Sequence, residues 1–166
     1  YITYIGHNHI HDMDFEINRP NGSGDYLALL IKSHGLFFID GKEVVVTPNT
    51  FFLYKKGTPQ YYKAYKEPFS NDWFHFELEE GEEDYFDKLG LAYEKPIKVD
   101  NITYFSMLIK QMTGEKYTAT KVSKCVIEHY MHIFFLKLTE MDELKQDVNK
   151  DINYDKVIIM TDADDD

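Results

Sequence analysis

Three histidines stand at alternate positions near the start of the chain, in the segment GHNHIHD (residues 6–12). Side chains two residues apart lie on the same face of a β-strand, so a strand here would bring His7, His9 and His11 together. Imidazoles at this spacing are common ligands of first-row metals. The segment therefore leaves two alternatives open: the metal site of an enzyme, or a surface strand that is rich in histidine.

The composition is that of a folded domain. The chain has 166 residues, of which 43% are hydrophobic and 16% aromatic, which favours a buried core over disorder. Its net charge of −11 would repel phosphate backbones, so we expect no nucleic-acid binding by this chain itself. No run of 18 apolar residues predicts a membrane span. The one cysteine, Cys125, lies among apolar neighbours; we expect it to be buried and the protein to be cytoplasmic.

Short strands fill the first half of the chain. Residues 1–80 contain short runs rich in Val, Ile, Tyr, Phe and Thr, and each run is bounded by turn signals. The dipeptide Asp40-Gly41, between LFFI and KEVVV, is typical of a tight β-hairpin. About six strands at this spacing predict an antiparallel barrel or sandwich.

From residue 81 the apolar period changes to that of helices. A short helix is expected over residues 82–89, ending at Gly90. A longer helix is expected over residues 101–116, where Gly114 is the stop signal, and another over residues 119–145. The pattern predicts a helical region over residues 81–148 that forms an antiparallel hairpin with apolar surface to spare, followed by an acidic, frayed tail over residues 149–166.

Residues 15–145 resemble the cupin-type ligand-binding and dimerisation domain of AraC/XylS-family transcription regulators. An ordered set of marks carries the resemblance: Arg19 before a Gly-rich turn, Asp25-Tyr26 opening an apolar strand, Gly35, the DG hairpin, KKGTPQYY (55–62) and DWFHF (72–76). The resemblance implies a cupin-like (jelly-roll) β-barrel followed by an antiparallel helical hairpin. It also implies a small-molecule ligand in the barrel, often a sugar, a homodimer formed by the helices, and DNA binding through a C-terminal helix-turn-helix module that we expect to be absent from this chain.

The candidate ligand-binding residues follow from this resemblance together with residue chemistry. The only arginine of the chain, Arg19, carries a rigid fork of donors, and Trp73 offers an apolar plane to a sugar ring. Strand alternation puts Trp73 on the same face as Asn71 and His75. The predicted ligand-binding set is Arg19, Tyr62, Asn71, Trp73 and His75, and the predicted dimer interface is Val122, Val126, Ile133 and Met141.

The resemblance also bears on the histidines. Metal-dependent cupins carry His-x-His and a glutamate on the strand that leads into the glycine turn, which corresponds to Gly35 here. That strand holds neither residue at the ligand positions, and Gln60 stands where the last histidine ligand would be. His9 and His11 lie one strand too early. We therefore expect no metal, no cofactor and no enzymatic activity; the alternative is a small metal-dependent cupin enzyme that acts on a sugar, as an isomerase or epimerase.

Overall fold

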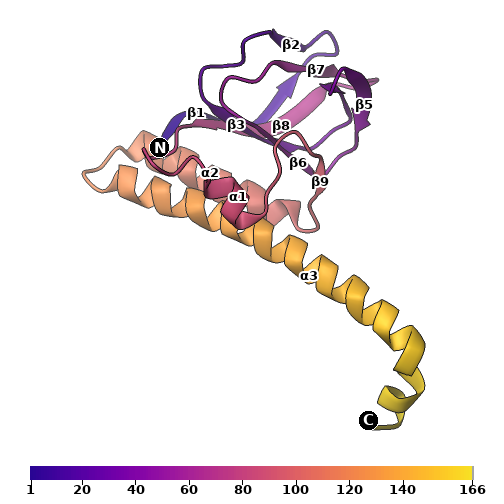
Figure 1. Ribbon diagram of the computed structural model, residues 1–166. Helices are drawn as coiled ribbons and strands as arrows, with labels where there is room; N and C mark the ends of the chain where they lie inside the picture. Colours follow the sequence, from indigo (N-terminus) through magenta and orange to yellow (C-terminus); the bar gives the residue numbers. More distant parts are fainter. Residues whose placement is uncertain (166) are drawn as a thin grey trace.

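The computed structural model describes residues 1–165, and the side chains of residues 1–146. A series of strands comes first and three helices follow (Figure 1). The strands are β1 (Ile2–His11), β2 (Glu16–Arg19), β3 (Tyr26–Ile31), β4 (Gly35–Ile39), β5 (Lys42–Val46), β6 (Thr50–Tyr54), β7 (Gln60–Ala64), β8 (Phe69–Phe76) and β9 (Ile97–Lys98). The helices are α1 (Tyr85–Leu89), α2 (Ile102–Thr118) and α3 (Ser123–Asp165).

The strands form two antiparallel sheets. One sheet has the order β1-β8-β3-β6-β9, and the other has the order β2-β7-β4-β5. Helices α2 and α3 lie side by side under the first sheet, so the molecule has three layers (Figure 1). The predicted class, mainly β with helices at the C-terminal end, is confirmed. The predicted barrel is not closed, because hydrogen bonds join the strands into two separate sheets.

Two hydrophobic cores lie on either side of the five-stranded sheet. All six residues of β3, YLALLI, are buried, since this strand has neighbours on both edges and a layer over each face. Ala28 and Leu30 belong to the core that the helices cover, together with Phe74, Phe76 and Phe135. The alternate residues Leu27 and Leu29 belong to the core between the two sheets, which also contains Phe37, Phe52 and Tyr62. The second core is the one that borders the candidate site.

Local turn signals account for some element ends and not for others. Asp40 and Gly41 both have positive φ (52° and 74°) and join β4 to β5, as predicted from the dipeptide. Gly90 ends α1 in the left-handed region, also as predicted. Gly114, by contrast, lies inside α2, which ends instead at Ala119. A single glycine costs a helix only about 1 kcal/mol, so the surrounding contacts carry α2 past it.

Helix α3 corrects two further predictions. It continues to Asp165, beyond the predicted end at residue 145 and into the predicted tail of residues 149–166, because no glycine or proline follows Gly114. The side chains of that tail lie outside the described residues. Cys125 is exposed rather than buried, since it lies on the outward face of this helix. Among the residues described, no helix carries an apolar stretch that could cross a lipid bilayer.

Candidate functional site

Strand β8 separates the two faces on which the site depends. Its burial alternates, and Phe74 and Phe76 pack in the core beneath the helices. Asn71, Trp73 and His75 face the opposite way, toward the four-stranded sheet. The predicted alternation of this strand is confirmed. The sequence pattern therefore identified the face of β8 that looks into the space between the sheets.

All five predicted ligand-binding residues line one cavity between the two sheets. The cavity has a volume of about 130 Å³, and its lining residues are His9, His11, Phe15, Ile17, Arg19, Leu27, Tyr62, Asn71, Trp73 and His75. We refer to it as the inner cavity. A second hollow of about 430 Å³, the outer hollow, shares Arg19, Trp73 and His75 with it and is completed by Tyr4, Gly22, Ser23 and Asp25. The two hollows adjoin, so one molecule could extend from the first into the second.

A chain of hydrogen bonds starts at Arg19 and runs around the rim. The Arg19 Nη1 donates to Gln60 Oε1 (2.9 Å), and Gln60 Nε2 donates to Ser23 Oγ (2.9 Å). Ser23 Oγ donates to Asp25 Oδ1 (2.7 Å), which also lies 2.8 Å from His75 Nδ1. These bonds hold Arg19 and His75 in fixed positions. Among the described side chains, no carboxylate forms an ion pair with Arg19.

Asn71 lines the inner cavity and carries an unsatisfied acceptor. The residue is 2% exposed, and its Oδ1 has no hydrogen-bond partner among the described groups. An unpaired buried polar atom costs about 1–3 kcal/mol, so natural proteins retain few of them without a reason. Tyr62 is also buried, and burial raises its pKa to about 12 although the neighbouring Arg19 acts in the opposite direction. The phenol is therefore neutral and can both donate and accept.

Gly6 makes room for the indole of Trp73. The two residues are paired across β1 and β8, and a Cβ on Gly6 would lie 2.5 Å from the indole Cε2. The absence of a side chain at residue 6 therefore lets the ring lie flat against β1. On this strand the indole Nε1 donates to His9 Nδ1 (3.0 Å), which fixes the ring in the wall of the cavity.

The three histidines do not share a face, which corrects the prediction from their spacing. Strand β1 changes register between Gly6 and His9, and Asn8 has a φ of 54° within this bulge. His7 turns toward the helices, where its Nε2 lies 3.1 Å from Ser106 Oγ. His9 and His11 line the inner cavity, with their rings 5.1 Å apart. Over the described part of the chain, no three His, Cys, Asp or Glu side chains are grouped so that they could hold a metal ion.

Burial lowers the pKa of two of these histidines. In His11 the desolvation of the ring is the main cause, and neighbouring His9 adds to it while Asp12 opposes it. In His7 desolvation again dominates; Asp72 raises its pKa, while Lys32 and Lys110 lower it. Both rings therefore favour the neutral form, in which an imidazole can donate from one nitrogen and accept at the other.

A second polar cluster lies on the opposite face of β8, and sequence reasoning missed it. The carboxylate of Asp72 is fully buried; it accepts from Lys32 Nζ (2.9 Å), from Ser106 Oγ (2.6 Å) and from the backbone N–H of Asn8 (2.6 Å). Three segments that are far apart in sequence therefore meet at one carboxylate. In the sequence, the only signal of this cluster was that strand alternation places the charged Asp72 on the otherwise apolar face of β8.

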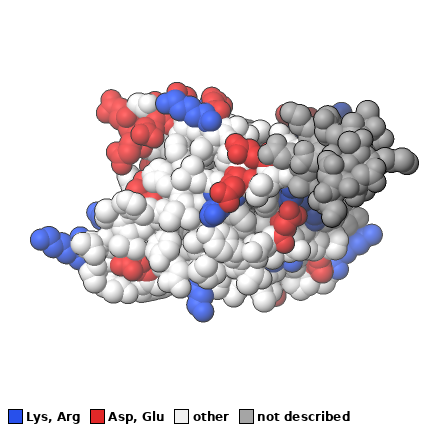
Figure 2. Space-filling model, turned by 90° about the horizontal axis from the view of Figure 1, so that it is seen from below, with Lys and Arg blue, Asp and Glu red and all other residues white. Residues whose placement is uncertain are grey.

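The predicted dimer residues fall into two groups. Val122 and Ile133 are exposed, at 58% and 40%, and with Val126 they line a shallow groove of about 340 Å³ on α3. Met141 is half-buried and packs against the helix-covered core, because eight residues rotate it by about 80° from Ile133. The structure does not bring Met141 together with the other three. In the view from below, charged side chains are scattered over the described surface and much of it is uncharged (Figure 2).

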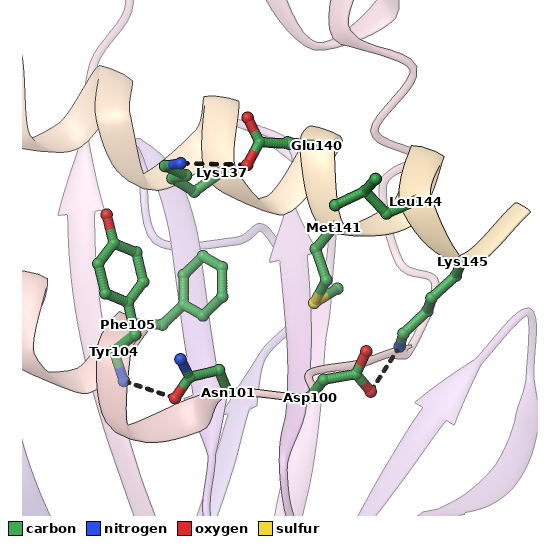
Figure 3. A pocket seen from close by; sticks show the side chains of 9 residues that line it. All are labelled: Asp100, Asn101, Tyr104, Phe105, Lys137, Glu140, Met141, Leu144 and Lys145. Carbon is green, nitrogen blue, oxygen red and sulfur yellow. Dashed lines mark hydrogen bonds and ion pairs between the residues drawn. The ribbon is translucent and has the colours of Figure 1, made fainter. Parts of the chain in front are cut away.

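A larger hollow lies elsewhere, between the start of α2 and the middle of α3 (Figure 3). It has a volume of about 730 Å³ and is open to solvent along its length. Its charged groups are already paired: Lys145 with Asp100 (3.3 Å) and Lys137 with Glu140 (3.1 Å). It contains none of the predicted ligand-binding residues and no unpaired buried polar atom among those described. The inner cavity is therefore the better candidate site.

Comparison with known proteins gives a structural match and no sequence match. No family model and no curated protein matches the chain. The similar structure is wild-type ToxT from Vibrio cholerae strain SCE256 with an unsaturated fatty acid bound, at 13% sequence identity and a TM-score of 0.45. The match covers 82% of this chain and 53% of ToxT, so the chain spans about half the length of that protein.

Proposed function

We propose that this chain is the ligand-sensing and dimerisation domain of an AraC-family DNA-binding transcription regulator, and that it acts without catalysis. The observation that carries the proposal is the inner cavity. The five residues expected to bind a ligand come from β2, β7 and β8 and line one space, and the buried acceptor of Asn71 has no partner among the described residues. DNA binding by the full protein is part of the proposal, and none of the residues described here is assigned to it.

The ligand in this proposal is a small polar molecule of the carbohydrate type. A sugar ring has an apolar C–H face that suits the indole of Trp73, and its hydroxyl groups suit the polar atoms of Arg19, Asn71 and Tyr62. The rim bonds from Arg19 through Gln60 and Ser23 to Asp25 hold Arg19 in place before a ligand arrives. Such preorganisation lowers the cost of binding. We place the protein in the cytoplasm, where a sensor of this kind would meet its ligand.

The homodimer in this proposal forms through α3. Val122, Val126, His129, Ile133 and Leu136 follow one another at steps of four and three residues, which is the spacing of a two-helix seam. Val122, Ile133 and Leu136 are 58%, 40% and 52% exposed, so the seam is open in the single chain. Two-fold pairing of a second copy along the same stripe would cover it.

A thermal-shift screen of monosaccharides and disaccharides tests the sensing role. A ligand present at about 100 times its Kd adds roughly 2.7 kcal/mol of apparent stability, which is readily measured. We expect a binder among these compounds, with its stabilisation lost in the Asn71→Leu variant and retained in Lys42→Gln, an exposed position on β5. If polar compounds stabilise the Asn71→Leu variant as much as the unaltered chain, the inner cavity is not the binding site.

A further inference from the structure

We infer that the ligand is an acid: a small hydroxylated carboxylate of the sugar-acid type, whose carboxylate binds Arg19 and one of whose hydroxyl groups donates to Asn71. This inference rests on the proposed function, since it requires a ligand in the inner cavity. It goes further by stating the charge of that ligand and which chemical group each side chain receives.

Arg19 is the reason for the negative charge. It is the only arginine in a chain of net charge −11, yet no described carboxylate pairs with it. Its Nη1 bonds to the neutral amide of Gln60, and Tyr62 is a second neutral neighbour, so among the described side chains no opposite charge compensates the guanidinium. A guanidinium matches a carboxylate with two parallel hydrogen bonds, and the pair strengthens as water is removed.

The rest of the inner cavity is also suited to an anion. None of its ten lining residues is acidic, and three of them are histidines, His9, His11 and His75. The nearest acidic group of the site, Asp25, lines only the outer hollow. Its carboxylate already receives Thr3 Oγ1 (2.9 Å), Ser23 Oγ (2.7 Å) and His75 Nδ1 (2.8 Å). The carboxylate of the ligand would therefore lie in the inner cavity, with its uncharged end in the outer hollow.

Asn71 is the reason for the hydroxyl group. Its Oδ1 is a buried acceptor with no partner among the described groups, on a residue that lines the inner cavity. A carboxylate cannot supply a proton to this atom, so the ligand must carry a separate donor near its acidic group. A hydroxyl on a neighbouring carbon meets this need, and the remaining carbon skeleton can lie on the indole of Trp73. These are the features of a sugar acid.

Matched pairs of sugars test the inference. D-galacturonate and D-galactose share one ring, as do D-glucuronate and D-glucose, and each pair differs in carrying a carboxylate or a CH₂OH group. Binding is followed by the fluorescence of Trp73, the only tryptophan of the chain. We expect one of the uronates to bind about tenfold or more tightly than its neutral partner. We also expect Arg19→Gln to remove that advantage, Arg19→Lys to retain part of it, and Lys42→Gln to leave it unchanged.

Three results would overturn the inference: a neutral sugar that binds as tightly as its uronate, a uronate affinity that Arg19→Gln leaves unchanged, or no binding by either uronate. Urea unfolding of each variant shows that it is folded. The proposed function is separated from the inference by a wider screen of neutral and cationic compounds. If one of these binds and Asn71→Leu abolishes its binding, the cavity is a sensor site whose ligand is not an acid. If no compound of any charge binds, both the inference and the proposed function fail.

Discussion

Asp72 and Trp73 are neighbours on β8 whose side chains lie on opposite faces of the five-stranded sheet. The indole of Trp73 forms a wall of the inner cavity, while the carboxylate of Asp72 binds Lys32 and Ser106 beneath α2. One peptide bond therefore links the candidate ligand site to the helical layer that carries the proposed dimer seam. A shift of β8 on ligand binding would move side chains on both faces of the sheet.

The Asp72→Asn substitution should lower the free energy of unfolding by about 3 kcal/mol. It leaves the ammonium of Lys32, whose side chain is 20% exposed, without its charged partner in a buried site. Urea denaturation measures the loss. The matched control is Asp84→Asn, because its pair with Lys88 is exposed on both sides and is worth less than about 1 kcal/mol. Equal small losses in the two variants would show that the buried cluster does not stabilise the contact between the sheet and α2.

The Gly6→Ala substitution should displace the indole of Trp73. The new Cβ would lie 2.5 Å from Cε2, so the ring must move and the bond from its Nε1 to His9 should break. We expect a shifted tryptophan emission maximum and a loss of about 1–3 kcal/mol of stability from the overpacked contact. Gly114→Ala is the control, since no atom lies within 4 Å of its added carbon and alanine favours the helix. Unchanged emission in Gly6→Ala would contradict the close approach of residues 6 and 73.

Stability should fall as the pH drops below about 6.5. The pKa values of His7 and His11 are lowered from 6.5 in the folded protein, so the unfolded chain binds protons first and acid favours unfolding. The stabilisation from these residues is fully present above pH 6.5 and is lost as the pH falls through their lowered pKa values. Urea midpoints measured between pH 5 and 8 should vary less in a His7→Gln/His11→Gln double variant. A double variant with the original slope would refute the assignment.

The Ile133→Glu substitution should convert the proposed dimer to a monomer. A carboxylate in the middle of the α3 seam would have to be desolvated when two copies meet. Sedimentation at micromolar concentration should show a dimer for the unaltered chain and a monomer for the variant. Tyr117→Glu, at an 85% exposed position on α2 that does not line the groove of α3, should remain dimeric. If the unaltered chain is strictly monomeric, the proposed dimer is wrong.

Short-range patterns in the sequence predicted much of the fold. The hairpin at Asp40-Gly41 and the end of α1 at Gly90 need only a positive φ, which local residue types signal. The alternation of β8 likewise identified the cavity-facing side of Asn71, Trp73 and His75, since a strand has a strict period of two.

Other features depend on contacts between distant segments. The bulge at Asn8, which separates His7 from His9, follows from the pairing of β1 with β8 and has no marker as strong as a glycine. The length of α3 was underestimated because the absence of stop signals is a weak clue. The cluster around Asp72 requires the registers of β1, β3 and α2 to be known at once.

The indole N–H of Trp73 provides the most direct test of the central claim, that small molecules bind between the two sheets. Because the chain has one tryptophan, this group gives a single resonance in a ¹H–¹⁵N correlation spectrum. Each compound that stabilises the protein is titrated while this resonance is recorded. The account predicts a saturable shift with the same apparent Kd as the stabilisation, and its loss in Asn71→Leu. A stabilising compound that leaves the indole resonance unmoved at saturation would contradict it.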